Sequence, residues 1–168
     1  MTARLSVEDA RPEDMEAIAA LNNAAVPNVN ALSAEEMAAI AAMGALRIVR
    51  AEGAVAGLVL TLPEGQPYPS MNYAWFSGRF DAFLYVDRIV VAPEARGLGI
   101  GRALYDDTAA RAAALGRPRV CAEVNVEPPN AGSMAFHAAS GFNVLLDRLN
   151  AESGKTVRMM ERPVSPSA

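Results

Sequence analysis

The sequence predicts an α/β (α+β) domain with a mixed central sheet of about seven strands and about four flanking helices. Runs of β-branched and other apolar residues alternate along the chain with Ala-rich runs of helical spacing, and Gly, Pro or Asn clusters separate them. A chain of 168 residues is long enough to bury one core, and its composition shows no break that would mark a second domain. We therefore expect residues 1–168 to form a single domain, with a flexible tail at 163–168.

The first third of the chain predicts a strand, two helices and a hairpin. Pro12 and the two acidic residues after it suit the first turn of a helix. Ser33-Ala34-Glu35-Glu36 is a capping box that opens a second helix, and Glu52-Gly53-Ala54 is a hairpin signal. The elements are a strand at Leu5–Glu8, helices from Pro12 to about Asn23 and from Ser33 to Gly44, and strands at Leu46–Ala51 and Val55–Leu62.

The segment Pro63–Arg79 predicts a loop rather than a regular element. Three prolines interrupt it, and its large aromatic residues are Tyr68, Tyr73, Trp75 and Phe76. A plain connection of this length is uncommon, and long loops often carry function. We interpret the segment as a lid or substrate-facing loop. In the alternative, the aromatic side chains pack back onto the core.

A glycine-rich junction follows the predicted central strand, Phe80–Val91, and leads into a predicted helix at about Gly101–Leu115. Gly97, Gly99 and Gly101 leave backbone N–H groups and the positive end of the helix dipole open to an anion such as a phosphate. The spacing fits neither the dinucleotide fingerprint nor a Walker loop. A tight turn without a ligand is the alternative.

The last third predicts a strand, a short helix and a closing hairpin. In Val120–Val126 the even positions are apolar and lie on one face, while Glu123 lies on the other face. A turn at Glu152-Ser153-Gly154 joins the last two strands. The elements are a strand at Val120–Val126, a helix from Asn130 or Ser133 to Ser140, and strands at Phe142–Leu149 and Lys155–Glu161.

Charge and cysteine usage exclude several classes of protein. Fifteen Lys and Arg against nineteen Asp and Glu give a net charge of −4, and no basic run suggests a nucleic-acid partner. One cysteine, Cys121, excludes a disulfide framework and a multi-cysteine metal site, so we predict no metal and an inert core thiol. No apolar window reaches the roughly 18 residues of a membrane span. We therefore expect a cytoplasmic protein with no membrane partner.

Two motifs in the chain resemble those of the GNAT acetyltransferase superfamily. The first is Arg-x-x-Gly-x-Gly at Arg96, Gly99 and Gly101, which is similar to that family's acyl-CoA pyrophosphate loop. The second runs from Asn130 to Phe142 and is similar to the family's Asn-x-x-Ala-x-x-Leu/Phe-Tyr-x-x-x-Gly-Phe helix. Residues 68–76 and 85–91 also resemble a bacterial branch of predicted acetyltransferases. The resemblance implies the GNAT fold, with splayed central strands.

The resemblance also implies that acetyl-CoA is the cofactor. In the family it lies across the central strand and the following loop, so that the strand backbone binds the pantetheine arm and the loop amides bind the pyrophosphate. For Asn130, capping of the helix is the alternative role. The implied cofactor-binding residues are Ile89, Val90, Val91, Arg96, Gly97, Leu98, Gly99, Ile100, Gly101, Arg102, Asn130, Phe136 and His137.

The implied reaction is attack of a neutral amine on a thioester, which needs a base because an alkylamine is protonated at pH 7. Glu123, a lone carboxylate in an apolar strand, is the first candidate, and Asp87 is the second. For both carboxylates a structural role is the alternative: a paired or rim position for Glu123, and for Asp87 an ion pair with a neighbouring Arg or a hydrogen bond that anchors the lid.

His137 occupies the position where the family usually has a Tyr as general acid. With a usual pKa of about 6.5, a histidine needs an acidic neighbour to stay charged at pH 7. Hydrogen bonding to the cofactor or to a carbonyl is the alternative role for His137, and Tyr85 can contribute a hydroxyl in its place.

We predict an acetyl-CoA-dependent N-acetyltransferase that acts on a small amine or a peptide N-terminus by direct attack in a ternary complex. A catalytically inactive acyl-CoA-binding sensor or interaction module is the alternative. Relatives suggest a homodimer, and the sequence does not name the acceptor. The candidate substrate-binding residues are Tyr73, Trp75, Phe76 and Tyr85.

Overall fold

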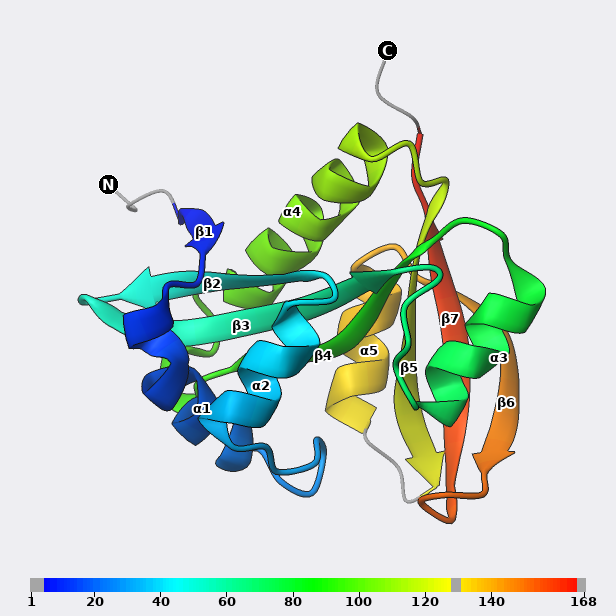
Figure 1. The fold of residues 1–168 in the computed structure, drawn as a ribbon, viewed down its shortest axis with the longest axis horizontal. Coiled ribbons are helices and arrows are strands. Elements are labelled where there is room, and N and C mark those ends of the chain that lie inside the picture. Colours follow the sequence, from blue (N-terminus) through cyan, green and yellow to red (C-terminus); the bar gives the residue numbers. More distant parts are fainter. Residues whose placement is uncertain (1–4, 128–130, 166–168) are drawn as a thin grey trace. The chain divides into compact units, whose positions relative to one another are not determined.

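The computed structural model describes residues 5–127 and 131–165, which form a seven-stranded sheet with five α-helices and two 3₁₀ helices (Figure 1). The hydrogen-bonded strand order is β1-β2-β3-β4-β5-β7-β6. β4 and β5 are parallel, whereas β1–β2, β2–β3, β5–β7 and β6–β7 are antiparallel. The predicted mixed α/β sheet is therefore confirmed. None of the helices in these ranges combines the length and apolar character needed to cross a bilayer.

The elements have the following bounds. The strands are β1 (Val7–Asp9), β2 (Ala45–Ala51), β3 (Ala54–Pro63), β4 (Leu84–Val91), β5 (Arg119–Glu127), β6 (Asn143–Asn150) and β7 (Lys155–Pro163). The α-helices are α1 (Met15–Asn23), α2 (Ala34–Ala41), α3 (Met71–Arg79), α4 (Ile100–Ala114) and α5 (Ala131–Ala139). The 3₁₀ helices are η1 (Pro12–Asp14) and η2 (Pro93–Ala95).

The chain forms two compact units. Unit one comprises residues 1–62 and 86–107, and unit two comprises residues 63–85 and 108–168. β4 and α4 each contribute residues to both units. That residues 1–168 form a single domain stays a prediction.

The core of unit one lies between the strands and the helix pair α1 and α2, which lie side by side (Figure 1). Ser33 caps α2 as predicted: its Oγ accepts from Glu36 N at 3.0 Å, and the Glu36 side chain accepts from Ser33 N at 3.0 Å. The β2–β3 hairpin turns at Glu52 and Gly53, both with positive φ. The buried apolar residues of this core are Ile18, Leu32, Met37, Leu46, Ile48, Leu58, Leu60 and Val90.

Unit two is built around β5, which pairs with β4 on one side and β7 on the other. The parallel pairing matches Tyr85 of β4 with Cys121 of β5, and the antiparallel pairing places Met159 of β7 opposite Glu123. β6 continues the sheet beyond β7, and α5 packs against β5. Tyr85 and Glu123 therefore lie on the neighbouring strands β4 and β5.

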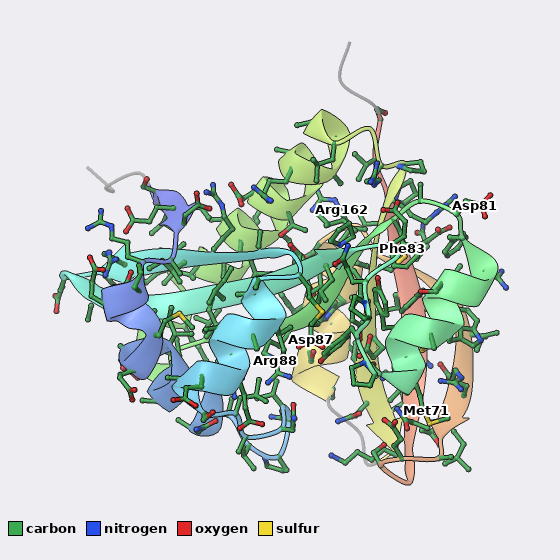
Figure 2. All side chains as sticks on the ribbon, viewed as in Figure 1. Met71, Asp81, Phe83, Asp87, Arg88 and Arg162 are labelled. Carbon is green, nitrogen blue, oxygen red and sulfur yellow. The ribbon has the colours of Figure 1, made fainter. Side chains whose placement is uncertain are left out.

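The prediction of a loop over Pro63–Arg79 is wrong for its second half, because Met71–Arg79 forms the helix α3. Figure 2 shows Met71 at the start of this helix and Phe83 beyond its end. The Ser70 hydroxyl caps the helix by accepting from Tyr73 N at 3.2 Å. Tyr73 and Phe76, one turn apart, are both buried. The missed signal is this short apolar stripe behind a serine cap.

The central strand is also shorter than predicted, since β4 begins at Leu84 rather than Phe80. Phe80 instead ends α3, where its N–H donates to the Phe76 carbonyl at 2.9 Å. The other predicted elements are confirmed within a few residues of their ends.

Candidate active site

The loop between β4 and α4 holds two glycines in the left-handed region, Gly97 at φ 84° and Gly99 at φ 83°. A β-carbon at Gly97 would meet no described atom within 4 Å, and one at Gly99 would meet only Leu5 Cδ1, at 3.9 Å. Glycine is therefore needed for the backbone conformation, while the space above the loop is open. Gly101 differs from these two because it lies inside α4.

The first turn of α4 directs backbone donors away from the helix. Ala103 N donates to Gly99 O at 3.0 Å, which is the first bond of the helix. The N–H groups of Ile100, Gly101 and Arg102 therefore precede the first residue with an intrahelical acceptor. Together with the helix dipole they form an anion-binding end, and the exposed side chains of Arg96 and Arg102 add positive charge.

Gly57 of β3 lets α4 approach the sheet of unit one. A β-carbon there would meet Ile100 Cγ2 at 2.5 Å and Leu104 Cδ1 at 3.3 Å. The helix start can therefore lie against β3 only because position 57 has no side chain. Sequence analysis missed this role, although a glycine inside a strand is itself a signal of close approach.

These features of unit one fit an anionic pyrophosphate. A β-carbon at Gly97 or Gly99 would have space, the N–H groups of Ile100 to Arg102 have no intrahelical acceptor, and the predicted contact residues run from Arg96 at the end of η2 to Arg102 in the first turn of α4. The residues predicted to bind the pantetheine arm, Ile89 to Val91, form the C-terminal end of β4 in the same unit. Asn130, also predicted to bind the cofactor, lies outside the described residues.

Glu123 is the centre of a polar cluster in unit two. Its Oε1 accepts from the Tyr85 hydroxyl at 2.7 Å and from Asn72 Nδ2 at 3.1 Å. Tyr85 is fully buried and Asn72 is 9% exposed, so both donors are held by packing. Sequence analysis found Glu123 and Tyr85, and missed Asn72, which lies on the unpredicted helix α3.

Asp87 forms an ion pair with the adjacent Arg88, whose Nε donates to Asp87 Oδ2 at 2.7 Å (labelled in Figure 2). Both side chains are buried, at 4% exposed for Arg88 and 6% for Asp87. Arg88 also donates to Asn22 Oδ1 at 3.0 Å and to Asn30 Oδ1 at 2.7 Å. This is the structural alternative considered for Asp87, so a catalytic role for it has less support than one for Glu123.

His137 is buried on α5 between the rings of Phe136 and Phe142. Its Nδ1 lies 2.7 Å from the Ser133 carbonyl oxygen, which can only accept, so Nδ1 carries the proton. Burial lowers the pKa of His137 below its usual value, and the bond to Ser133 offsets this in part. A neutral imidazole with its one proton bound to a carbonyl is poorly suited to act as a general acid.

As the pH is lowered below about 6.5, we expect the free energy of unfolding to decrease more steeply in the native protein than in His137→Phe. The unfolded chain takes up a proton on His137 near pH 6.5, whereas the folded state does so only at lower pH, which favours unfolding in that window. Urea titrations at several pH values between 7 and 5 measure this. Parallel curves for the two proteins would contradict it. No other histidine is present to obscure the difference.

The aromatic residues predicted to bind substrate lie in and around the core of unit two. The Tyr73 hydroxyl donates to the Pro63 carbonyl at 2.5 Å, and the Tyr73 and Tyr85 ring centroids are 5.4 Å apart. Phe76 is fully buried, while Trp75 is half-buried beneath the Arg79 guanidinium. This packing agrees with the alternative reading of the segment. Substrate binding by Tyr73, Trp75, Phe76 and Tyr85 stays a prediction.

Cys121 is fully buried in β5, and burial raises the pKa of its thiol far above the usual value. An uncharged buried thiol is unreactive, which supports its predicted role as an inert core residue. In residues 5–127 and 131–165, no cluster of three or more His, Cys, Asp or Glu side chains is arranged to hold a metal ion.

Comparison with known proteins identifies the same fold. Residues 19–142 match the model of the Acetyltransferase (GNAT) family. A search of curated proteins gave no match. Similar solved structures include the ribosomal-protein-S18-alanine N-acetyltransferase from Escherichia coli, at 17% identity, covering 98% of this chain and 97% of that one with a TM-score of 0.72.

Two further solved structures are similar at low identity. Naa20 of Chaetomium thermophilum, solved with a bisubstrate analogue, has 22% identity and a TM-score of 0.77, covering 95% of this chain and 86% of its own. YncA of Salmonella typhimurium, solved with its cofactor acetyl-CoA, has 18% identity and a TM-score of 0.72, covering 99% and 97%. These likenesses confirm the predicted fold.

Proposed function

Since the chain belongs to the GNAT acetyltransferase family, we propose that it transfers an acetyl group from acetyl-CoA to a primary amine by direct attack. The acceptor is a small molecule or a peptide N-terminus. The observation that carries the amine acceptor is the Glu123 carboxylate, which buried donors hold in place on β5. An amine nucleophile needs such a base, whereas a thioester-binding module does not.

The open loop at the start of α4 supports acetyl-CoA as the donor. The amides of Gly97 to Arg102 would hold its pyrophosphate, and the strand end Ile89 to Val91 would hold its pantetheine arm. When bound, acetyl-CoA supplies an activated acyl carbon as a thioester. The YncA structure contains acetyl-CoA in the same fold, which supports this assignment.

Glu123 is the proposed general base. An alkylamine with a pKa near 10.4 is almost entirely protonated at pH 7 and must lose a proton before it can attack. The two donors on Oε1 favour the ionised carboxylate, which is the form that accepts a proton. The amine proton passes to Glu123 directly or through one water.

Tyr85 is better placed than His137 to act as the general acid that protonates the leaving group. Tyr85 would give its hydroxyl proton to the leaving CoA thiolate, and Glu123 would return the proton taken from the amine to Tyr85 across their 2.7 Å hydrogen bond. The proton on His137 Nδ1 is instead bound to the Ser133 carbonyl. We therefore assign the proton-donating role to Tyr85 ahead of His137.

An acyl-CoA-binding module without turnover is the second candidate. The observation that favours it is His137, which stands in the family's usual Tyr position and is held neutral by burial. Such a module would bind acetyl-CoA through the same loop and release no thiol.

A thiol-release screen separates the two functions. The full chain is incubated with acetyl-CoA and a panel of small amines and peptides with free N-termini, and each acetylated product is identified by mass spectrometry. We expect release of free CoA with at least one amine, at a rate that rises with pH until Glu123 is ionised. Tight acetyl-CoA binding with no release across the whole panel would instead support the binding module.

A further inference from the structure

A continuous chain of hydrogen bonds in unit two ends at the Glu123 carboxylate. It begins at the β6–β7 turn, where Asn150 Oδ1 accepts from Glu152 N at 2.9 Å and from Ser153 N at 3.4 Å. Asn150 Nδ2 then donates to Asn72 Oδ1 at 3.1 Å, and Asn72 Nδ2 donates to Glu123 Oε1 at 3.1 Å. The chain thus joins a backbone turn to the proposed base through two amides.

Each amide in this chain has one possible orientation. Backbone N–H groups can only donate, so the acceptor oxygen of Asn150 must face the turn and its NH₂ group must face Asn72. Asn72 Oδ1 receives that NH₂ and also Arg148 Nη1 at 3.3 Å. The NH₂ group of Asn72 therefore has to face Glu123. A flipped Asn72 would set its oxygen against the carboxylate and its NH₂ against two donors.

We propose that Asn72 is a positioning residue that fixes the direction and the ionised state of the Glu123 carboxylate, with Asn150 holding Asn72 in the required orientation. The part of this inference that concerns catalysis rests on the proposed function, whereas the effect of Asn72 on the Glu123 carboxylate does not. Asn72 is 9% exposed and Asn150 is 6% exposed, so water competes little with either amide. Helix α3, predicted as a loop, would thus supply a group that the reaction needs without touching substrate.

Besides Asn72, several other groups of unit two lie around Glu123. β4 contributes the Tyr85 hydroxyl, and β5 itself contributes the Cys121 thiol, whose pKa burial raises. β7 places uncharged Met159 opposite Glu123, and β6 contributes Arg148 through Asn72. α5, packed on β5, carries His137, whose pKa burial lowers. The raised pKa of Cys121 and the lowered pKa of His137 keep both of these groups uncharged near pH 7.

The test is a carbon-13 NMR titration of the Glu123 side-chain carboxyl in the free protein, with the signal assigned by its loss in Glu123→Gln. Asn72→Ala removes the donor and should raise the titration midpoint by about one pH unit. Asn72→Asp keeps an acceptor for Asn150 and Arg148 but sets a second carboxylate against Glu123, and should raise the midpoint further. The matched control is Asn143→Ala, an exposed asparagine on β6.

A rise in the order native, Asn72→Ala, Asn72→Asp supports the positioning role, and the acidic limb of the pH–kcat profile should move in the same direction. Midpoints of both variants equal to those of the native protein and Asn143→Ala would overturn it. Because the titration needs no activity, failure of the amine screen with a normal midpoint shift would reject the proposed function and leave the positioning role standing.

Discussion

Glu123→Gln lowers kcat for acetyl transfer by about 10²–10⁴-fold, the usual contribution of a general base. Glutamine keeps the acceptor oxygen that Tyr85 and Asn72 bind, so the packing around position 123 is retained. What is lost is the ability to take the proton of the amine. Steady-state kinetics at saturating acetyl-CoA measure the change, and the affinity for acetyl-CoA should stay the same.

Glu161→Gln is the matched control for this loss. Glu161 lies on the neighbouring strand β7, where it accepts from Arg119 Nε at 2.9 Å. Its removal deletes a carboxylate from the same sheet and should leave kcat nearly unchanged. If Glu123→Gln kept native kcat, or if both variants lost activity equally, Glu123 would not be the base.

Arg88→Met lowers the free energy of unfolding by about 3–5 kcal/mol, as expected when one partner of a buried ion pair is removed. The substitution leaves the buried Asp87 carboxylate without the guanidinium and removes the donors that bind Asn22 and Asn30. Those bonds join β4 to Asn22 of α1 and to Asn30 in the segment between α1 and α2. Urea unfolding followed by circular dichroism measures the loss.

Arg158→Met shows how much an exposed pair contributes to the same measurement. Arg158 binds Asp147 through two hydrogen bonds of 2.8 and 3.0 Å, but the side chains are 29% and 41% exposed. The expected loss is about 0–1 kcal/mol. Equal losses for Arg88→Met and Arg158→Met would mean that burial does not strengthen the Arg88 cluster.

The sequence predicted features whose causes lie within a few residues. The Ser33 capping box, the Glu52-Gly53 turn and the Gly97–Gly99 loop each depend on neighbours in the chain, and each is present. The alternation of β5 also separated Glu123 from the apolar face. These local signals account for most of the fold and for the candidate base.

Partners distant in the sequence could not be predicted. Asn72 precedes Glu123 by 51 positions, and Asn150 follows Asn72 by 78, so only the folded chain brings them together. α3 was missed because its nine residues include Gly78 and several aromatics, which are weak helix formers. Packing of Tyr73 and Phe76 into the core overrides that weakness.

Asp87 and His137 show a different limit of the sequence. The sequence suggested an ion pair with a neighbouring Arg as one of the alternatives for Asp87. Adjacent strand residues point to opposite faces, so only the structure shows that the Arg88 side chain reaches Asp87. For His137, neither the tautomer nor the burial could be predicted from the sequence. Both follow from the Ser133 carbonyl one turn earlier and from the rings of Phe136 and Phe142.

Isothermal titration with acetyl-CoA tests the central claim most directly, using the native chain, Gly97→Glu and Gly53→Glu. Gly97 and Gly53 have nearly the same φ, 84° and 80°, and at both a β-carbon would meet no described atom within 4 Å. The two substitutions therefore impose similar backbone strain and the same charge, but only Gly97 lies in the proposed phosphate loop. We predict binding by the native chain and Gly53→Glu and none by Gly97→Glu. Absence of binding by the native chain at millimolar acetyl-CoA, or equal binding by all three, would contradict the account.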